Sequence, residues 1–226
     1  LSLHDALPIC TISLIFFIGF GVKSGVFPLY FWLPASYHTP PAAVSALFGG
    51  LLTKVGVYAM IRVFTLLFPI SGINQTVFIV IAVFTIIFGG IGALVQKDMV
   101  RTFSYLIICH IGFMIGGLSM FTEMALVGVV FYMFHDIIVK ANLFLIGGFT
   151  FRIFGNNKLS EMGGLMNNYP KLALLFAIPL FALVGIPPLS GFWPKISLFG
   201  ASYETGNIGL LVAFIFASFI TLFILA

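Results

Sequence analysis

Residues 123–151 read EMALVGVVFYMFHDIIVKANLFLIGGFTF, a stretch in which almost every side chain is apolar. It is longer than the roughly 20 apolar residues that a helix needs to cross a bilayer core about 30 Å thick. Asp136 and Lys140 are charged residues near its middle, and His135 stands beside them. The stretch therefore predicts a transmembrane helix that carries ionisable groups at membrane depth.

The composition of the whole chain agrees with a membrane protein. Of the 226 residues, 61% are hydrophobic and 7% are charged, against about 25% charged in a typical soluble domain, and the mean hydropathy is +1.21. The net charge of +4 comes from scattered single cations, which excludes a nucleic-acid partner. Cys10 and Cys109 lie in different apolar stretches without metal-ligand spacing, so we expect no metal site.

Apolar stretches separated by polar or Pro/Gly segments predict an all-α, polytopic transmembrane bundle with about seven spans. These spans cover residues 10–32, 42–67, 74–95, 102–120, 123–151, 171–199 and 207–226. We expect residues 1–9 to be a non-native or disordered start. Residues 10–226 are then expected to form one antiporter-like transmembrane domain that is incomplete at both ends.

The distribution of basic residues predicts the orientation of these spans. The connections 33–41, 96–101 and 152–170 would share one side of the membrane. The basic residues in or beside them are Lys97, Arg101, Arg152, Lys158 and Lys171. The connections on the other side contain no Lys or Arg, so the positive-inside rule makes the first side cytoplasmic.

Apolar sequence also surrounds four lysines, Lys23, Lys54, Lys140 and Lys195. A charged side chain at the bilayer centre costs at least about 2.5 to 3.5 kcal/mol on insertion scales, so such residues usually face protein or water and mark ion routes. The alternative is that some of them reach the interface through their long stems.

Asp136 and Lys140 are four residues apart, which places them on one helix face where they can pair. Together with His135 they offer a carboxylate, an amine and an imidazole whose reference pKa values differ widely. We expect a proton relay here, and the alternative is a static ion pair that holds two helices together. His110 stands alone in its span, which favours a packing role.

Prolines interrupt two of the expected spans close to buried lysines. Pro28 follows Lys23, while Pro187 and Pro188 precede Lys195. Proline removes a helix hydrogen bond and clashes with the preceding turn, so the sequence predicts two discontinuous helices. Transporters use such breaks as ion sites, although a kink made only for packing is the alternative.

Four segments resemble one family of membrane subunits. They are GFGVKSGVFPLYFWLPASYHTPPAAVSALFGGLLTKVGVYAMIR (residues 19–62), QKDMVRTFSYLIICHIGFMIGGL (96–118), HDIIVKANLFLIGG (135–148) and GIPPLSGFWPK (185–195). The resemblance is to the proton-pumping membrane subunits shared by respiratory complex I, membrane-bound hydrogenases and multisubunit Mrp-type cation/proton antiporters. LLTKVGVYA and HDIIVKANLFL are most similar to the D subunits of the Mrp-type branch.

This resemblance implies a role for each buried group. Lys23 matches the lysine of the family's first broken helix, whose usual glutamate partner is not in this sequence. Lys54 matches the lysine of the next helix, and Lys140 with His135 matches the central relay. Lys195 matches the charged residue of the second broken helix. The spans would be the last two helices of one five-helix repeat and all of its inverted partner.

The resemblance further implies a subunit of a multisubunit Na⁺/H⁺ antiporter in the inner membrane of a bacterium or archaeon. Protons would pass along the buried Lys, His and Asp residues, with Asp136 standing where many relatives carry histidine. The expected partners are other membrane subunits, Na⁺, H⁺ and the lipid bilayer. We expect an ion transporter subunit and no enzyme or cofactor.

Three alternatives stay open at this point. The chain could belong to a proton-pumping subunit of a complex I-like NADH:quinone oxidoreductase or a membrane-bound hydrogenase. It could be a membrane enzyme acting on lipid, with His110 or His135 as base, although no nucleophile or metal motif supports that. It could also be a scaffold bundle whose lysines only pair internally.

Overall fold

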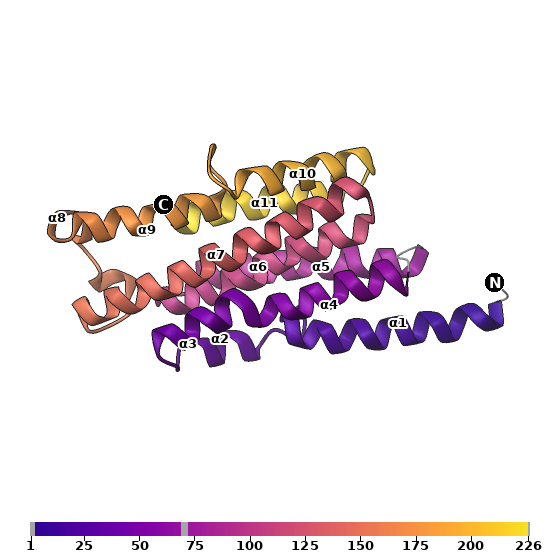
Figure 1. Cartoon of the computed structure of the whole chain (residues 1–226), viewed down its shortest axis with the longest axis horizontal. Coiled ribbons are helices and arrows are strands. Elements are labelled where there is room, and N and C mark those ends of the chain that lie inside the picture. The colour runs from indigo at the N-terminus through magenta and orange to yellow at the C-terminus, as the bar shows by residue number, and fades with distance from the viewer. Residues whose placement is uncertain (1–2, 69–71, 226) are drawn as a thin grey trace.

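The computed structural model describes residues 3–68 and 72–225, and it is a bundle of helices that run roughly along one long axis (Figure 1). The α-helices are α1 (Leu3–Ser24), α2 (Trp32–Tyr37), α3 (Ala42–Leu47), α4 (Thr53–Leu66), α5 (Gly72–Leu94), α6 (Met99–Met120), α7 (Glu123–Phe154), α8 (Leu165–Asn168), α9 (Pro170–Val184), α10 (Phe192–Glu204) and α11 (Ile208–Leu225). A π-helical segment η1 (Phe48–Leu52) joins α3 to α4, and a 3₁₀ turn η2 (Leu159–Glu161) follows α7.

Five stretches of the described chain are long and apolar enough to cross a membrane. They are Ala42–Leu66, Asn74–Leu94, Met99–Met120, Glu123–Phe154 and Ile208–Leu225. Thr11–Ser24 and Pro170–Val184 are shorter apolar helices, and they belong to the two spans that were expected to be interrupted. The predicted all-α, multi-pass membrane architecture with discontinuous helices is confirmed.

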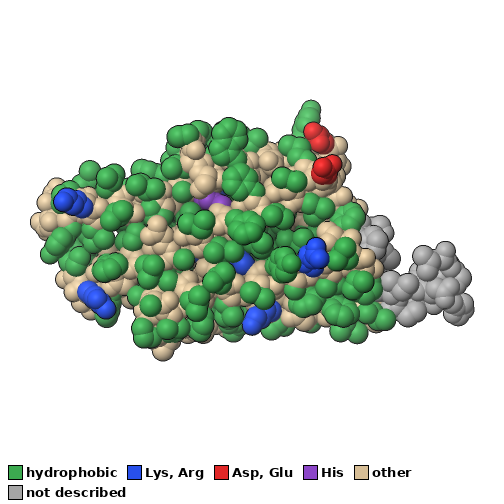
Figure 2. Space-filling view, in the orientation of Figure 1, with side chains coloured by type: hydrophobic (Ala, Val, Ile, Leu, Met, Phe, Trp, Pro, Cys, Tyr) green, Lys and Arg blue, Asp and Glu red, His purple; other side chains and the backbone are tan. Residues whose placement is uncertain are grey.

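The outer surface of the bundle is apolar. Figure 2 shows hydrophobic side chains over most of the visible face, with Lys and Arg scattered singly among them. Large side chains such as Ile138 and Phe219 are about two-thirds exposed, at 68% and 67%. Lipid tails solvate such a surface without penalty, so this outer face is suited to contact with a bilayer.

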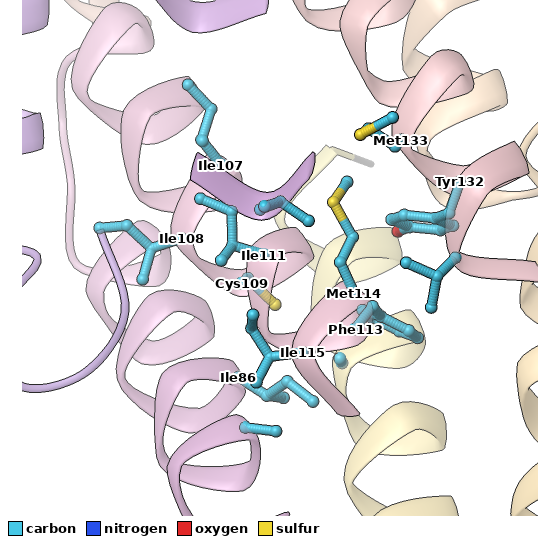
Figure 3. Packing of buried hydrophobic residues seen from close by; sticks show 14 of the residues in the cluster. Ile86, Ile107, Ile108, Cys109, Ile111, Phe113, Met114, Ile115, Tyr132 and Met133 are labelled. Atoms are coloured by element: carbon cyan, nitrogen blue, oxygen red, sulfur yellow. The ribbon is translucent and has the colours of Figure 1, made fainter. Parts of the chain in front are cut away.

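Helix α6 is the buried axis of the bundle. Almost all of its side chains are shielded from solvent, and α5, α7, α10 and α11 pack around it. Figure 3 shows Ile115 of α6 close to Ile86 of α5, and Phe113 and Met114 of α6 close to Tyr132 of α7. Small residues permit this close packing, since a Cβ added at Gly112 would lie 2.5 Å from Ile86.

Both predicted helix breaks are present. Between α1 and α2, Gly25 has a φ of +77° and Pro28 lies in the turn that follows. Between α9 and α10, Gly185 has a φ of +89° and precedes Pro187 and Pro188. A positive φ strains any residue that carries a Cβ, so glycine suits the end of each broken helix.

The π-helical segment η1 was not predicted from the sequence. It interrupts the span 42–67 directly before Lys54. Its glycines pack closely against α7: a Cβ at Gly49 would lie 2.5 Å from the Phe144 ring, and one at Gly50 would lie 3.1 Å from the Ile137 carbonyl oxygen. Single π turns inside helices frequently mark functional sites.

Helix α1 begins at Leu3, within the segment 1–9 that was expected to be non-native or disordered. The backbone over residues 3–9 is therefore helical and continuous with the apolar helix that follows. Residues 1–2 lie outside the described part of the chain.

Two of the basic connections meet at one end of the bundle. The amide of Met99 donates to the Asn157 carbonyl at 2.9 Å, and the amide of Leu159 donates to the Lys97 carbonyl at 3.0 Å. The start of α6 and the loop after α7 are thus joined, as expected for connections on the same side of a membrane.

Candidate ion-translocation site

A buried ion pair joins α4 to α7. The Lys54 Nζ of α4 is 2.6 Å from Oδ2 of Asp136 on α7, and both side chains are almost fully buried. Lys54 also donates to the carbonyl oxygen of Gly49, at 2.9 Å. A buried pair of charges is tolerated when further hydrogen bonds satisfy its groups, and η1 supplies one of them.

The second oxygen of Asp136 contacts a histidine from another helix. His110 Nδ1 of α6 lies 3.0 Å from Asp136 Oδ1, and both groups are completely buried. A carboxylate only accepts, so Nδ1 carries the hydrogen of this bond. His110 Nε2 has no hydrogen-bond partner among the described residues. His110 is packed in the bundle, as expected, and its ring also contacts the charged cluster, which its isolated place in the sequence did not indicate.

The expected pairing of Asp136 with Lys140 is not the one observed. Lys54 and His110 occupy the two carboxylate oxygens, and within the described chain Lys140 Nζ has no hydrogen-bond partner although the residue is 0% exposed. Spacing of four residues places Asp136 and Lys140 on one face, but the packing of α4 and α6 decides which partner the short Asp side chain contacts. An unpaired buried ammonium is costly, so Lys140 is suited to gain and lose a proton.

His135 connects this cluster to the second broken helix. Its Nδ1 lies 2.9 Å from Oγ of Ser190, in the turn between α9 and α10. The turn approaches closely because the next residue is Gly191: a Cβ there would clash with the Ala182 carbonyl and lie 2.8 Å from His135 Nε2. The sequence indicated His135 as a site residue but not Ser190. The one feature of the sequence that could have indicated Ser190 is its position shortly after Pro187 and Pro188.

Lys195 closes the end of the broken helix α9. Its Nζ donates to the carbonyl oxygens of Leu183 at 3.1 Å and Val184 at 2.7 Å. These are the last carbonyls of α9, which lose their helical donors where the helix ends. The same Nζ lies 5.5 Å from the centroid of the Phe113 ring, within cation–π range. The lysine therefore fills the break with a positive charge.

A tyrosine that contacts both histidine rings was missed by the sequence analysis. The Tyr132 ring centroid is 5.8 Å from that of His110 and 5.9 Å from that of His135. Its hydroxyl is buried and has no hydrogen-bond partner among the residues that the structure describes. Buried polar groups of this kind are usually satisfied by ordered water, so the hydroxyl is suited to bind a water molecule beside the histidines.

Lys23 stands apart from these residues. It lies in the last turn of α1 and its side chain is exposed. The structure thus brings Lys54, His135 and Asp136 into one buried region, and it leaves Lys23 outside this region. Lys140 is also buried on α7, and Lys195 is buried on α10.

The comparisons with known proteins identify the family. Residues 2–221 match the family described as NADH:quinone oxidoreductase/Mrp antiporter, TM, and the chain belongs to this family. The chain is 47% identical over 213 residues to the D subunit of the Na(+)/H(+) antiporter of Alkalihalophilus pseudofirmus. That alignment covers 94% of this chain and 43% of the relative, so the chain spans less than half the length of that relative.

Solved structures of two membrane complexes share the fold of this chain. The chain matches a structure of the Mrp complex from Dietzia sp. DQ12-45-1b with a TM-score of 0.91 and 29% identity, over 96% of this chain and 40% of that one. It also matches the membrane-bound sulfane sulfur reductase, an archaeal respiratory membrane complex, with a TM-score of 0.86 and 30% identity, over 92% and 43% of the two chains.

Proposed function

We propose that this chain is part of a subunit of a multisubunit Na⁺/H⁺ antiporter, in which buried ionisable residues carry protons through the membrane. The observation that carries the proposal is the buried cluster in which Asp136 pairs with Lys54 and His110 while Lys140 stays unpaired. Charged groups at this depth mark ion pathways rather than packing. The relative from Alkalihalophilus pseudofirmus, which is named as an antiporter component, supports the antiporter branch.

Asp136 can exchange partners in such a pathway. It now pairs with Lys54 across two helices, and Lys140 lies one turn further along its own helix. A proton that arrives on Lys140 adds a second positive charge close to the carboxylate and weakens the hold of Lys54 on it. The charge on Lys140 therefore controls how tightly Lys54 pairs with Asp136, as a proton relay requires.

The remaining buried groups extend this relay toward α10. His110 Nε2 and His135 Nε2 are nitrogens without a hydrogen-bond partner in the described chain, so each is free to exchange a proton with water. Lys195 holds a further exchangeable proton at the break of α9. Membrane potential, worth about 2.3 kcal/mol per charge per 100 mV, would drive protons along this row in exchange for sodium.

A second candidate is a proton-pumping subunit of a respiratory complex. The likeness to the sulfane sulfur reductase complex favours it, and the buried residues would do the same work there. In that case the partner subunits determine whether a redox reaction or sodium exchange drives the movement of protons.

Expression of the intact gene with its genomic neighbours in antiporter-deficient cells separates the two functions. Everted vesicles are first loaded with protons, and sodium is then added. Dissipation of the pH gradient on addition of sodium is the result expected for the antiporter. Proton movement that follows only a redox substrate would reject the antiporter and favour the respiratory subunit.

A further inference from the structure

A cavity of about 510 Å³ opens at the end of the bundle that carries the basic connections. Its walls come from the α2–α3 loop, α3, the start of α6 and the second half of α7. Polar side chains line it, including those of His38, Ser45, Arg152 and Asn157. A polar cavity of this size has room for several water molecules with hydrogen-bond partners.

The cavity follows the face of α7 that carries Lys140. The α7 residues that line it are Phe144, Gly147, Gly148, Phe151 and Arg152. Relative to Lys140 they fall at helical spacings of four, seven, eight, eleven and twelve residues, which is one continuous stripe. Phe144 is the member of this stripe nearest to Lys140, so the lining of the cavity reaches to within about one helical turn of Lys140 along α7.

Other side chains enclose the Phe144 ring. The residue is 1% exposed, and its ring makes edge contacts with Tyr37 and Phe103 at centroid distances of 6.3 and 6.0 Å. It lies directly against Gly49, where an added Cβ would come within 2.5 Å of the ring. The Gly49 carbonyl in turn binds Lys54, so Phe144 links the lining of the cavity to this part of the charged cluster.

We infer that Phe144 is the gate between a hydrated cavity on the cytoplasmic side and the buried amines of Lys140 and Lys54. Apolar constrictions close ion routes by excluding water. With the ring in its present place the route is closed, and displacement of the ring connects the cavity to Lys140. The inference rests on the proposed proton pathway and adds to it the place where protons enter and the residue that controls their passage.

Thiol labelling tests the gate without any need for ion exchange. The full-length protein is assembled with its partner subunits, with its native cysteines replaced, and carries either Ser45→Cys in the cavity wall or Lys140→Cys behind the ring. A membrane-impermeant cationic thiol reagent is applied to everted vesicles. Ser45→Cys is expected to react and Lys140→Cys to stay unreactive. Adding Phe144→Ala is expected to raise the rate at Lys140→Cys several-fold.

Phe103→Ala is the matched control. It removes a neighbouring ring from the same aromatic cluster, but Phe103 does not line the cavity, so Lys140→Cys should stay unreactive. Phe144→Leu removes less volume, so it is expected to give an intermediate labelling rate at Lys140→Cys. This variant replaces Phe144→Ala in the test if the alanine variant fails to assemble. Reaction at Lys140→Cys with Phe144 intact, or no reaction at Ser45→Cys, would overturn the gate. Labelling as expected in a complex that lacks sodium exchange would reject the antiporter and keep the gate.

Discussion

Asp136 joins three helices through its two carboxylate oxygens. One oxygen contacts Lys54 of α4 and the other contacts His110 of α6, while the residue itself belongs to α7. Removing one member of a buried pair leaves an uncompensated charge, which is strongly destabilising. The carboxylate is thus both the structural link among these helices and the negative charge around which the buried cations are arranged.

A double-mutant cycle tests which lysine is its partner. Lys54→Ala and Asp136→Ala are each expected to destabilise the purified complex by about 3 to 5 kcal/mol, and the double variant by clearly less than the sum, because the unpaired charge disappears with its partner. The measurement is thermal unfolding in detergent. The matched cycle with Lys140→Ala should show clearly weaker coupling than the cycle with Lys54→Ala, because Lys140 makes no direct contact with the carboxylate. Strong coupling to Lys140 and none to Lys54 would show that the observed pairing is wrong.

Sequence alone could select most of these residues but not their partners. Lys54, Asp136 and Lys140 are visible because a charge in apolar sequence is expensive. His110 was assigned to packing, although a histidine at membrane depth is itself a signal of a buried partner. Its contact with Asp136 joins residues 26 positions apart, and only the packing of α6 on α7 determines it.

At the scale of elements, the broken helix α9–α10 depends on Lys195 as its cap. The lysine donates to two terminal carbonyls of α9. Lys195→Met removes both hydrogen bonds and is expected to cost about 1 to 3 kcal/mol for each unsatisfied carbonyl. Lys171→Met, an exposed change in the same helix, should stay within about 0.5 kcal/mol of the parent. Equal thermal stability of the two variants would argue against the capping role.

The turn between α9 and α10 makes a second prediction at this scale. Gly191→Ala places a methyl group against the Ala182 carbonyl and 2.8 Å from His135 Nε2. It is expected to push the turn from α7, to break the contact between His135 and Ser190, and to lower sodium-dependent proton flux while insertion persists. Gly163→Ala, where an added Cβ meets nothing within 4 Å, is the control. Normal flux with Gly191→Ala would exclude a functional role for this close contact.

The helix breaks and the π-helical segment differ in how far sequence reveals them. Pro28, Pro187 and Pro188 act on the local backbone, so their effect can be predicted from their position. The π turn η1 contains no proline. It forms where Gly49 and Gly50 pack against α7, and no local pattern encodes that tertiary contact.

At the scale of the whole molecule, the basic connections predict which end of the bundle is cytoplasmic. Ser160→Cys, in the loop after α7, is expected to react with an impermeant thiol reagent in everted vesicles. Glu204→Cys, at the end of α10, should react only when the opposite face is exposed. Both positions are on the surface, so the result depends on orientation rather than burial. The reverse pattern would invert the topology and move the cavity at Phe144 to the other side of the membrane.

The central claim is that buried charges carry protons through this bundle, and Lys140 tests it most directly. The measurement is sodium-dependent proton flux in everted vesicles that contain the full-length protein with its neighbouring subunits. Lys140→Ala is expected to abolish the flux at an unchanged protein level. Lys158→Ala, which removes an exposed lysine paired with Glu161 at 3.0 Å, should leave it intact. Unchanged flux with Lys140→Ala would contradict the account.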